Sequence, residues 1–479
     1  MRLPAVLYRY MAVDNKNSRF RWRGQTSFVV IAVGATLSLK DFLTFPVMAG
    51  ENGGGAFLLL YALFLFLLGF PLLVSEFMLG RLTRNNFVDA VDQLSTEHSA
   101  SVYWKTIAAL ALLAGILVLS SYSVISGWSL AYFFKTGLGV FSGATADGVN
   151  ALFKNFRTDT EAMMLWHTLF VILMVSISAQ SLKKGLQRVF LILVPLMVGL
   201  LLIGLLYAFY SGGMLESIEY ILMPDWSRVD ASMPLLALQR AFFTLTLGLG
   251  VMVIYGAYLD EEIPLGYVTG QVILIDLLFS IFAGLAINAL VFSVDMEPVL
   301  DDELAFRVLP VMFGAFQYGA IFGALFYLLL VLAAITTSVA ILEAILSFYM
   351  LKYRQTRLKA TAQLGLFIWL LGLGTIFSYS VWNESGLTLT MDFGNETYRL
   401  VNEAGFQDVI IFISSHFIQP LVALMLSLYV GWIIPRKISF DALKFSNRKY
   451  YEIWNFSIRY ITPVLVFIVF LSTMGLVNK

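Results

Sequence analysis

The sequence predicts an all-α polytopic membrane protein with about eleven transmembrane helices, two of which are broken at mid-membrane. Of the 479 residues, 59% are hydrophobic and only 13% are charged, whereas soluble proteins carry roughly 25% charged residues. Apolar stretches of membrane-spanning length, about 20 residues, follow one another along most of the chain. The first and sixth of them contain charges and glycines in their interior, which indicates breaks in those two helices.

The predicted spans follow the hydropathy of the chain. They lie near residues 27–48, 56–80, 104–135, 162–180, 187–211, 235–258, 266–293, 318–351, 361–381, 405–434 and 458–476. Breaks in spans one and six fit a five-plus-five inverted repeat whose functional site lies between the two breaks. The expected organisation is an N-terminal segment over 1–26, a first repeat over 27–211, a second repeat over 235–434 and a final helix over 458–476.

Basic residues define the expected orientation in the membrane. They gather in the N-terminal segment and in alternate loops, at Arg81 and Arg84, at Lys183, Lys184 and Arg188, at Lys352, Arg354, Arg357 and Lys359, and at Arg436, Lys437, Lys444, Arg448 and Lys449. By the positive-inside rule the N-terminus is cytoplasmic. The acidic loop 260–262 is the one cytoplasmic loop that does not fit. We expect a multi-pass protein of a cell membrane such as the bacterial inner membrane.

Composition excludes several classes of protein. A formal net charge of zero suggests no nucleic-acid partner. The absence of cysteine excludes disulfides, thiol catalysis and cysteine-ligated metals. His98, His167 and His416 lie far apart in the sequence and make no metal-ligand spacing. No nucleophile–base pair or phosphate-binding loop is evident, so we expect neither an enzyme nor an organic cofactor.

The first span contains the most informative stretch of the chain, around Lys40 and Asp41. A charge at mid-membrane costs at least about 2.5–3.5 kcal/mol, and Gly34, Ser38 and Pro46 weaken helical continuity here. We interpret the stretch as an unwound segment, which is tolerated only where the freed backbone lines a cavity or is buried in protein. Free carbonyls suit a hard cation, and a half-helix N-terminus suits an anion. The alternative is a kinked packing helix whose charges are satisfied by neighbours.

Spans six to eight carry further polar residues. In span six, Arg240 lies in an apolar stretch, and Gly248 and Gly250 interrupt the helix. Span seven holds Asp276, and span eight contains the hydroxyl run 336–338. These groups could serve packing alone, since hydroxyls often bond to the carbonyls of the preceding turn. Adjacent hydroxyls beside a broken helix would also complete an oxygen-only shell for a hard ion.

The positions of Glu76 and Tyr122 each allow two interpretations. Glu76 in span two is either a buried acid or an interfacial carboxylate near Arg81. Tyr122 lies well inside span three, and it is either an aromatic packing residue or a hydroxyl that faces a cavity.

Three segments together resemble the neurotransmitter:sodium symporter family, specifically its bacterial amino-acid transporters. They are Phe45-Pro46 followed by 51–57, the loop 220–225 and the run 242–250, and the resemblance covers about residues 19–434. It implies a LeuT-like fold that binds substrate and two sodium ions at mid-membrane.

The resemblance implies a second sodium site that is intact in this chain. Its ligands would be the carbonyls of Gly34, Leu37 and Ala333 and the hydroxyls of Thr336 and Thr337. All five are neutral oxygens, which suit Na⁺.

The first sodium site departs from the family pattern. It would consist of Thr36, Asp41, Thr244 and Asp276, and the family has asparagines where this chain has the two aspartates. Lys40 stands where the family has a glycine. Three readings stay open. In the first, Lys40, with or without Arg240, replaces the first sodium as a fixed cation, because four buried charges that cancel are cheaper than one alone. In the second, two carboxylates make a stronger cation site. In the third, one carboxyl carries a coupled proton.

The implied substrate pocket is mostly apolar. Its residues would be Leu39, Lys40, Val118, Tyr122, Phe243, Thr246, Leu249 and Ile341. Tyr122 matches the tyrosine whose hydroxyl contacts the substrate carboxylate. Tyr61, Thr244 and Ser280 match three positions of the chloride site of animal members, and Arg240 stands at the fourth, usually a glutamine.

Both gates differ from the family pattern. The ion pair of the outer gate is replaced by Thr44 and Ile411. At the inner gate Arg19, Trp22 and Tyr258 match the family, but the acidic partner aligns with Leu351.

We therefore expect a sodium-coupled symporter of a small, apolar amino acid. It would carry Na⁺ at the second site, with use of the first site left open. The alternatives are a membrane amino-acid sensor or receptor with the transporter fold, and a proton-coupled or sodium-independent transporter. The expected partners are the amino acid and the lipid bilayer, and both monomer and homodimer stay open.

Overall fold

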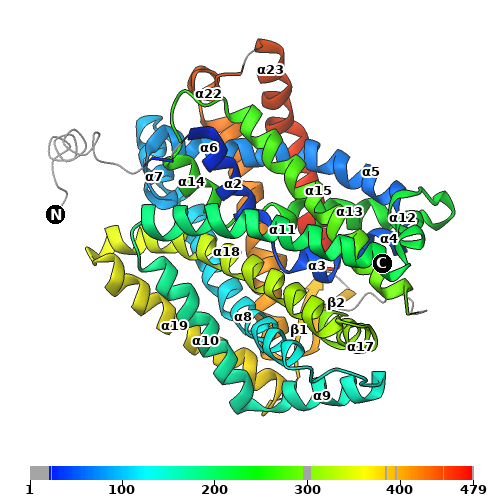
Figure 1. Cartoon of the computed structure of the whole chain (residues 1–479). Helices are drawn as coiled ribbons and strands as arrows, with labels where there is room; N and C mark the ends of the chain where they lie inside the picture. The colour runs from blue at the N-terminus through cyan, green and yellow to red at the C-terminus, as the bar shows by residue number, and fades with distance from the viewer. Residues whose placement is uncertain are drawn as a thin grey trace.

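The computed structural model of the protein describes residues 21–22, 24–294, 304–382, 386–393, 396–445 and 447–476. Arg19, expected at the inner gate, and nearly all of the N-terminal segment 1–26 lie outside the described residues. The described part is a bundle of membrane-length helices with shorter helices at its ends and one hairpin (Figure 1).

Spans one and six are both broken, as the sequence predicts. Span one consists of α2 (Gly24–Thr36), α3 (Lys40–Leu43) and α4 (Phe45–Glu51), and residues 37–39 between α2 and α3 are not helical. Span six consists of α13 (Met233–Thr244) and α14 (Val251–Ala257), with residues 245–250 between them.

Nine further helices in the described residues are long and apolar enough to cross a membrane. They are built from α5 (Gly55–Phe64), η1 (Leu65–Gly69) and α6 (Phe70–Thr83); η2 (Val102–Trp104) and α8 (Lys105–Gly137); α10 (Thr160–Ser178); η3 (Lys183–Gln187) and α11 (Arg188–Ser211); α15 (Leu265–Phe292); α18 (Gly319–Tyr353); α19 (Arg357–Tyr379); α20 (Phe406–Ile411), η5 (Phe412–Ile418), α21 (Gln419–Leu428) and η6 (Tyr429–Ile433); and α23 (Arg448–Phe456), η7 (Ser457–Ile461) and α24 (Thr462–Thr473). With the two broken spans they make up the eleven that the sequence predicts, and the polytopic helical fold class is confirmed.

Short helices cover the ends of the bundle, and the sequence analysis did not place them. They are α7 (Phe87–Glu97), α9 (Ala146–Thr158), α12 (Met214–Leu222), η4 (Trp226–Arg228), α16 (Leu304–Arg307), α17 (Leu309–Ala315) and α22 (Arg436–Leu443). Asn86 caps α7 by accepting the backbone N–H of Asp89, and Thr145 caps α9 by accepting that of Gly148. Such caps satisfy backbone donors that a helix start leaves unpaired.

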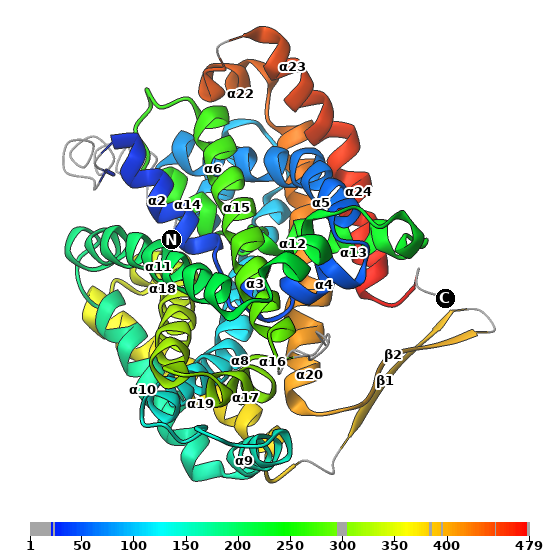
Figure 2. The ribbon, with the colours of Figure 1, turned by 45° about the vertical axis from the view of Figure 1, so that its right-hand side comes forward.

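A two-stranded antiparallel hairpin lies between spans nine and ten. Strand β1 (Leu387–Phe393) pairs with β2 (Glu396–Ala404), with Thr390 opposite Arg399 and Met391 opposite Tyr398. Figure 2 shows the hairpin projecting from the helical body. The sequence analysis left this segment as a loop, so the hairpin is an addition to the predicted helical fold.

Small residues let the broken helices approach their neighbours closely. The backbone of α14 lies against α6, where a Cβ at Gly80 would be 1.7 Å from the carbonyl oxygen of Val253. On the facing helix, a Cβ at Gly256 would be 2.2 Å from the carbonyl oxygen of Phe77. Only glycine permits this separation, which is the usual role of small residues between membrane helices.

The turn after span one joins two of the segments that carry the family resemblance. Gly53 and Gly54 both have positive φ, and the backbone N–H of Asp225 donates to the carbonyl of Gly53 over 3.1 Å. The N–H of Gly55 donates to the carbonyl of Met223 over 3.1 Å. The loop 220–225 therefore packs directly on the glycine turn, which fixes the outer end of the broken span.

Candidate functional site

The breaks of spans one and six lie side by side. The hydroxyl of Thr246 donates to the carbonyl of Ala35 over 2.9 Å. Thr246, Gly248 and Gly250 all have positive φ, between 55° and 77°, so the chain between α13 and α14 cannot continue as a helix. The two unwound segments form one polar region inside an apolar bundle, as an inverted repeat with broken helices requires.

Glu76 is a buried acid that supports the second break. Its Oε1 accepts the backbone N–H of Gly248 over 2.8 Å, and the side chain is 1% exposed. Gln419 supports the same segment by donating to the carbonyl of Leu247 over 2.8 Å. Arg81 does not contact Glu76 and instead donates to backbone carbonyls of Ile263 and Ala442. The buried reading of Glu76 is therefore the correct one.

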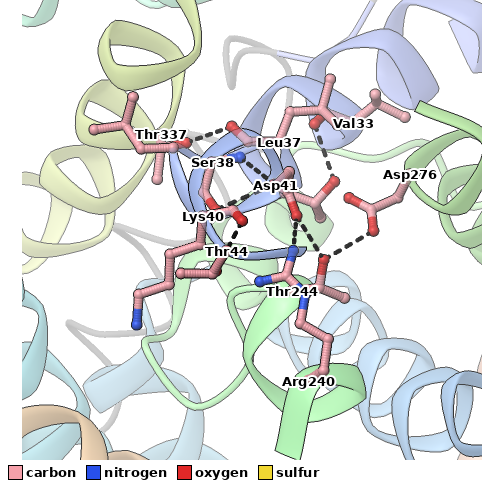
Figure 3. A network of polar contacts seen from close by, with 12 residues as sticks. Val33, Leu37, Ser38, Lys40, Asp41, Thr44, Arg240, Thr244, Asp276 and Thr337 are labelled. Atoms are coloured by element: carbon pink, nitrogen blue, oxygen red, sulfur yellow. Dashed lines mark hydrogen bonds and ion pairs between the residues drawn. The ribbon is translucent and has the colours of Figure 1, made fainter. Parts of the chain in front are cut away.

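Two residues of the expected second sodium site contact each other at the break in span one. The hydroxyl of Thr337 on α18 donates to the carbonyl of Leu37 over 2.7 Å (Figure 3). The hydroxyl of Thr336 donates to the carbonyl of Ala333 over 3.0 Å. Thr336, Thr337 and Ala333 are all buried. Gly34 lies one turn before the break, and its own Cα faces Val194 on α11. The donor set is neutral oxygen throughout, which suits a hard monovalent cation.

The residues of the expected first sodium site also cluster, but a protein cation stands among them. The hydroxyl of Thr244 is 3.3 Å from Oδ1 of Asp41 and 3.1 Å from Oδ2 of Asp276. Arg240 forms an ion pair with the same Oδ1 of Asp41, and the side chains of Arg240 and Asp41 are 4% and 0% exposed. Thr36 is buried nearby, and its hydroxyl donates to the carbonyl of Val33 over 3.0 Å.

The carboxylate of Asp41 is fully occupied by protein donors. Its Oδ2 accepts the backbone N–H of Ser38 over 2.6 Å and the hydroxyl of Ser38 at 3.1 Å. Its Oδ1 contacts Arg240 and Thr244. A carboxylate has about four lone-pair sites, so these four contacts leave Asp41 little capacity to bind a free ion.

Lys40 lies apart from the two aspartates in the structure. Its side chain is exposed, and Nζ lies 5.8 Å from the ring centroid of Phe243. Figure 3 shows the ammonium directed away from Asp41 and Asp276. Lys40 therefore lies outside the cluster of Asp41, Thr244 and Asp276 in this structure, and the cation that pairs with Asp41 is Arg240.

The three hydroxyls at the expected chloride positions differ in their hydrogen bonding. Thr244 is engaged with the two aspartates. The hydroxyls of Tyr61 and Ser280 are buried and have no hydrogen-bond partner among the described residues. Arg240 also lies over the ring of Phe45, with its guanidinium carbon 5.2 Å from the centroid.

The residues of the expected substrate pocket lie around the first break. The hydroxyl of Tyr122 accepts the backbone N–H of Leu39 over 3.2 Å. Leu39, Thr246, Leu249 and Ile341 are buried, and Val118, Tyr122 and Phe243 are partly buried. Tyr122 therefore directs a polar hydroxyl at the start of α3, within walls that are otherwise mainly apolar.

Comparisons with known proteins identify the family of this chain. The sequence matches the model of the sodium:neurotransmitter symporter family over residues 19–141 and 157–478. The chain belongs to this family. It is 32% identical to the uncharacterized sodium-dependent transporter YhdH of Bacillus subtilis, over 96% of this chain and 98% of the relative.

A second sequence relative and one solved structure are also similar to this chain. An uncharacterized sodium-dependent transporter of Haemophilus influenzae is 27% identical over 97% of this chain and 100% of that protein. The crystal structure of MhsT in complex with L-phenylalanine superposes with a TM-score of 0.83 at 32% identity, covering 95% of this chain and 100% of that one. MhsT has the LeuT-like fold, so the LeuT-like fold of this family member is confirmed.

At the outer gate this family member has no charged pair at the expected positions. Thr44 lies between α3 and α4, and its hydroxyl donates to the carbonyl of Lys40 over 3.0 Å. Ile411 is the last residue of α20 and is partly buried. Both side chains are neutral, so a gate that closes at these positions would close through van der Waals packing and not through an ion pair.

Near the residues expected at the inner gate, the structure shows a buried acid that the sequence analysis missed. Leu351, aligned with the acidic partner, is 61% exposed. Two turns earlier on α18, Glu343 is buried and forms a bidentate ion pair with Arg357 at 3.2 and 2.5 Å. The hydroxyl of Tyr258 contacts Glu343 at 3.4 Å. The sequence signal that could have identified this contact is Glu343 itself, because it is an acidic residue inside the apolar eighth span.

Trp22 completes the inner contact between the broken helices and this ion pair. Its backbone N–H donates to the carbonyl of Tyr258 over 3.1 Å, and its indole N–H donates to the carbonyl of Tyr255 over 3.1 Å. The rings of Trp22 and Tyr258 meet edge to face at 5.6 Å. The contacts from Trp22 through Tyr258 and Glu343 to Arg357 thus link the segment before α2, the end of α14, α18 and α19.

Replacing Glu343 by glutamine should destabilise the protein, because the change leaves the mostly buried guanidinium of Arg357 without its charge partner. Removing one partner of a buried pair costs about 3–5 kcal/mol. Thermal unfolding of the purified protein measures the loss. Adding Arg357→Gln to Glu343→Gln should recover most of it. A double variant whose loss equals the sum of the two single losses would show that the pair contributes no coupling energy.

Proposed function

We propose that the protein is a sodium-coupled secondary active transporter of a small amino acid with an apolar side chain. The observation that carries this proposal is the contact between Thr337 and the carbonyl of Leu37. It places one hydroxyl of the α18 pair on a carbonyl at the break of the first span, where a bound Na⁺ would link the two elements. Sodium bound there would couple the positions of span one and span eight. The proposal includes a cell-membrane location with the N-terminus on the cytoplasmic side, which the positive-inside rule supports.

Ion coupling in this proposal uses the second site, with Arg240 as a fixed cation in the first. The ion pair of Arg240 with Asp41 supports this role. A tethered guanidinium stays in the protein through the whole cycle, whereas sodium is released with the substrate. The consequence is about one Na⁺ per substrate rather than two.

The exposed position of Lys40 changes the charge balance that the sequence predicted. Asp41 and Asp276 now face only Arg240, which leaves one negative charge. Thr244 has one hydroxyl proton but contacts both carboxyl groups. A protonated Asp276 that donates to Thr244, which in turn donates to Asp41, would complete a neutral chain without a bound ion. Sodium at Asp276 is the competing arrangement.

The proposed substrate has an apolar side chain because the pocket walls offer few polar partners. An unpaired polar group on a ligand would cost about 1–3 kcal/mol. The relative MhsT was crystallised with phenylalanine, which supports an apolar amino acid here. In a competition panel, leucine, valine or alanine should displace a bound substrate better than glutamate or lysine. Stronger competition by glutamate would instead assign Lys40 to a second carboxylate on the substrate.

Uptake by proteoliposomes under an inward sodium gradient tests the transport function. The proposal expects accumulation of substrate that collapses when the gradient is removed. The second candidate is a membrane amino-acid sensor, and the neutral outer-gate residues Thr44 and Ile411 favour it. Sodium-dependent substrate binding without any uptake would support the sensor and contradict the transporter.

A further inference from the structure

An arginine lies on the membrane-facing side of the seam between the tenth and eleventh spans. Arg459 belongs to η7, eleven residues after Arg448 begins the last span. Its guanidinium carbon lies 4.1 Å from the ring centroid of Trp432, and the indole N–H of Trp432 donates to the carbonyl of Arg459 over 3.2 Å. Trp432 is 51% exposed, so this cation–π pair lies at the outer surface of the bundle.

Hydrogen bonds on the opposite face fix the direction of this side chain. Ser457 and Thr462 both donate to the carbonyl of Leu67 in span two, over 3.2 and 3.4 Å. The polar groups of the inner face of span eleven are thereby satisfied inside the bundle. Phe456 and Tyr460 on the other face are 56% and 46% exposed. Arg459 lies between these two exposed aromatic residues in sequence and is partly buried.

The guanidinium has no acidic partner in the part of the chain that the structure describes. None of the ion pairs found there involves Arg459, and its Nε atom is buried without a hydrogen-bond acceptor. An arginine in a membrane-spanning helix is costly unless it reaches an anion or the interface. Because the guanidinium of Arg459 has aromatic neighbours and no carboxylate partner among the described residues, an anion from outside the chain is the partner that would stabilise it.

The contact with Trp432 places Arg459 beside the last turn of span ten, next to one expected membrane interface. Trp432 is in η6, the last turn of span ten, and Arg436 and Lys437 follow just after that span. Arg448 and Lys449 begin the next span on the same side. Exposed aromatic residues with basic residues beyond them mark a membrane interface, and such basic seams attract anionic lipids.

The local backbone is unusual at the same point. Both η6 and η7 are π-helical segments, and they contact each other. A Cβ at Gly431 would lie 3.0 Å from the Cα of Arg459, so the glycine lets the two backbones meet. Segments of π-helix inside α-helices are frequent at functional sites. The contact holds Trp432 and Arg459 side by side at the surface of the bundle.

We propose that Arg459 and Trp432 form a binding site for the phosphate of an anionic phospholipid at the seam of spans ten and eleven. The guanidinium would donate to the lipid phosphate, and Arg436 and Lys437 would add positive potential on its headgroup side. The indole and the phenol of Tyr460 would lie along the glycerol region. Guanidinium–phosphate contacts are among the stronger hydrogen bonds in proteins.

Native mass spectrometry of the purified full-length protein with added phosphatidylglycerol tests the site. The wild type should retain phosphatidylglycerol in preference to phosphatidylcholine. Arg459→Gln should weaken phosphatidylglycerol binding about tenfold and leave phosphatidylcholine binding unchanged. Arg459→Lys should fall between the two, because a lysine keeps the charge but lacks the planar fork.

A matched control separates this site from general surface charge. Lys184 is an exposed basic residue in a different loop, and Lys184→Gln should bind phosphatidylglycerol as the wild type does. Trp432→Leu, which keeps every charge, should also weaken binding. Equal binding by wild type and Arg459→Gln, or an equal loss in Lys184→Gln, would overturn the proposal. Should Arg459→Gln fail to fold, unchanged binding in Trp432→Leu would overturn it.

Discussion

Replacing Thr336 and Thr337 together by alanine should abolish sodium-stimulated substrate binding. Both hydroxyls belong to the proposed ion shell, and the hydroxyl of Thr337 also contacts the carbonyl of Leu37 directly. Their loss removes two of five neutral oxygens, and the remaining carbonyls cannot replace the hydration shell of Na⁺. Binding of radiolabelled substrate to purified protein, measured across a sodium titration, gives the result.

Ser338 offers a matched control for this double change. It follows Thr337 on the same helix, and its buried hydroxyl has no hydrogen-bond partner among the described residues. Ser338→Ala should therefore leave the sodium titration close to that of the wild type. A double variant that keeps full sodium stimulation would show that the ion binds elsewhere.

Replacing Arg240 by glutamine should create a new sodium dependence and reduce stability. The change leaves Asp41 and Asp276 without the guanidinium, and breaking such a buried pair costs about 3–5 kcal/mol. At high sodium the two carboxylates can recover part of that loss by capturing a cation. The thermal unfolding temperature should therefore rise with sodium more steeply in Arg240→Gln than in the wild type.

A second change tests whether this effect comes from the charge of Asp41. Adding Asp41→Asn to Arg240→Gln removes both members of the pair and should restore much of the stability at low sodium. It also brings position 41 to the asparagine of the family pattern. If Arg240→Gln unfolds at the same temperature as the wild type at every sodium concentration, Arg240 is not the fixed cation of this site.

The sequence predicted the framework of the site better than its details. Hydropathy located the spans, and the charges and glycines around Asp41 and Gly248 located the two breaks, because membrane energetics penalise both features. The family resemblance placed Thr337 and Leu37 in one expected ligand set, and in the structure the hydroxyl of Thr337 donates to the carbonyl of Leu37. The spans and the two breaks needed only residue type and spacing.

Side-chain direction was the part that the sequence could not predict. Lys40 and Asp41 are adjacent, and only the position of the short helix α3 shows which of them enters the bundle. The partnership of Glu343 with Arg357 depends on how α18 packs beside α19. The hairpin between spans nine and ten reads as a polar loop, since its pairing gives no signal in hydropathy.

The number of sodium ions carried with each substrate tests the central claim most directly. Reversal potentials of wild-type protein in proteoliposomes, measured across a series of sodium gradients, report that ratio. We propose that Arg240, which pairs with Asp41, takes the place of the first ion and that Na⁺ binds at the second site, so we predict about one sodium ion per substrate. A ratio of two would contradict the fixed-cation role of Arg240 and would favour a sodium site at Asp276.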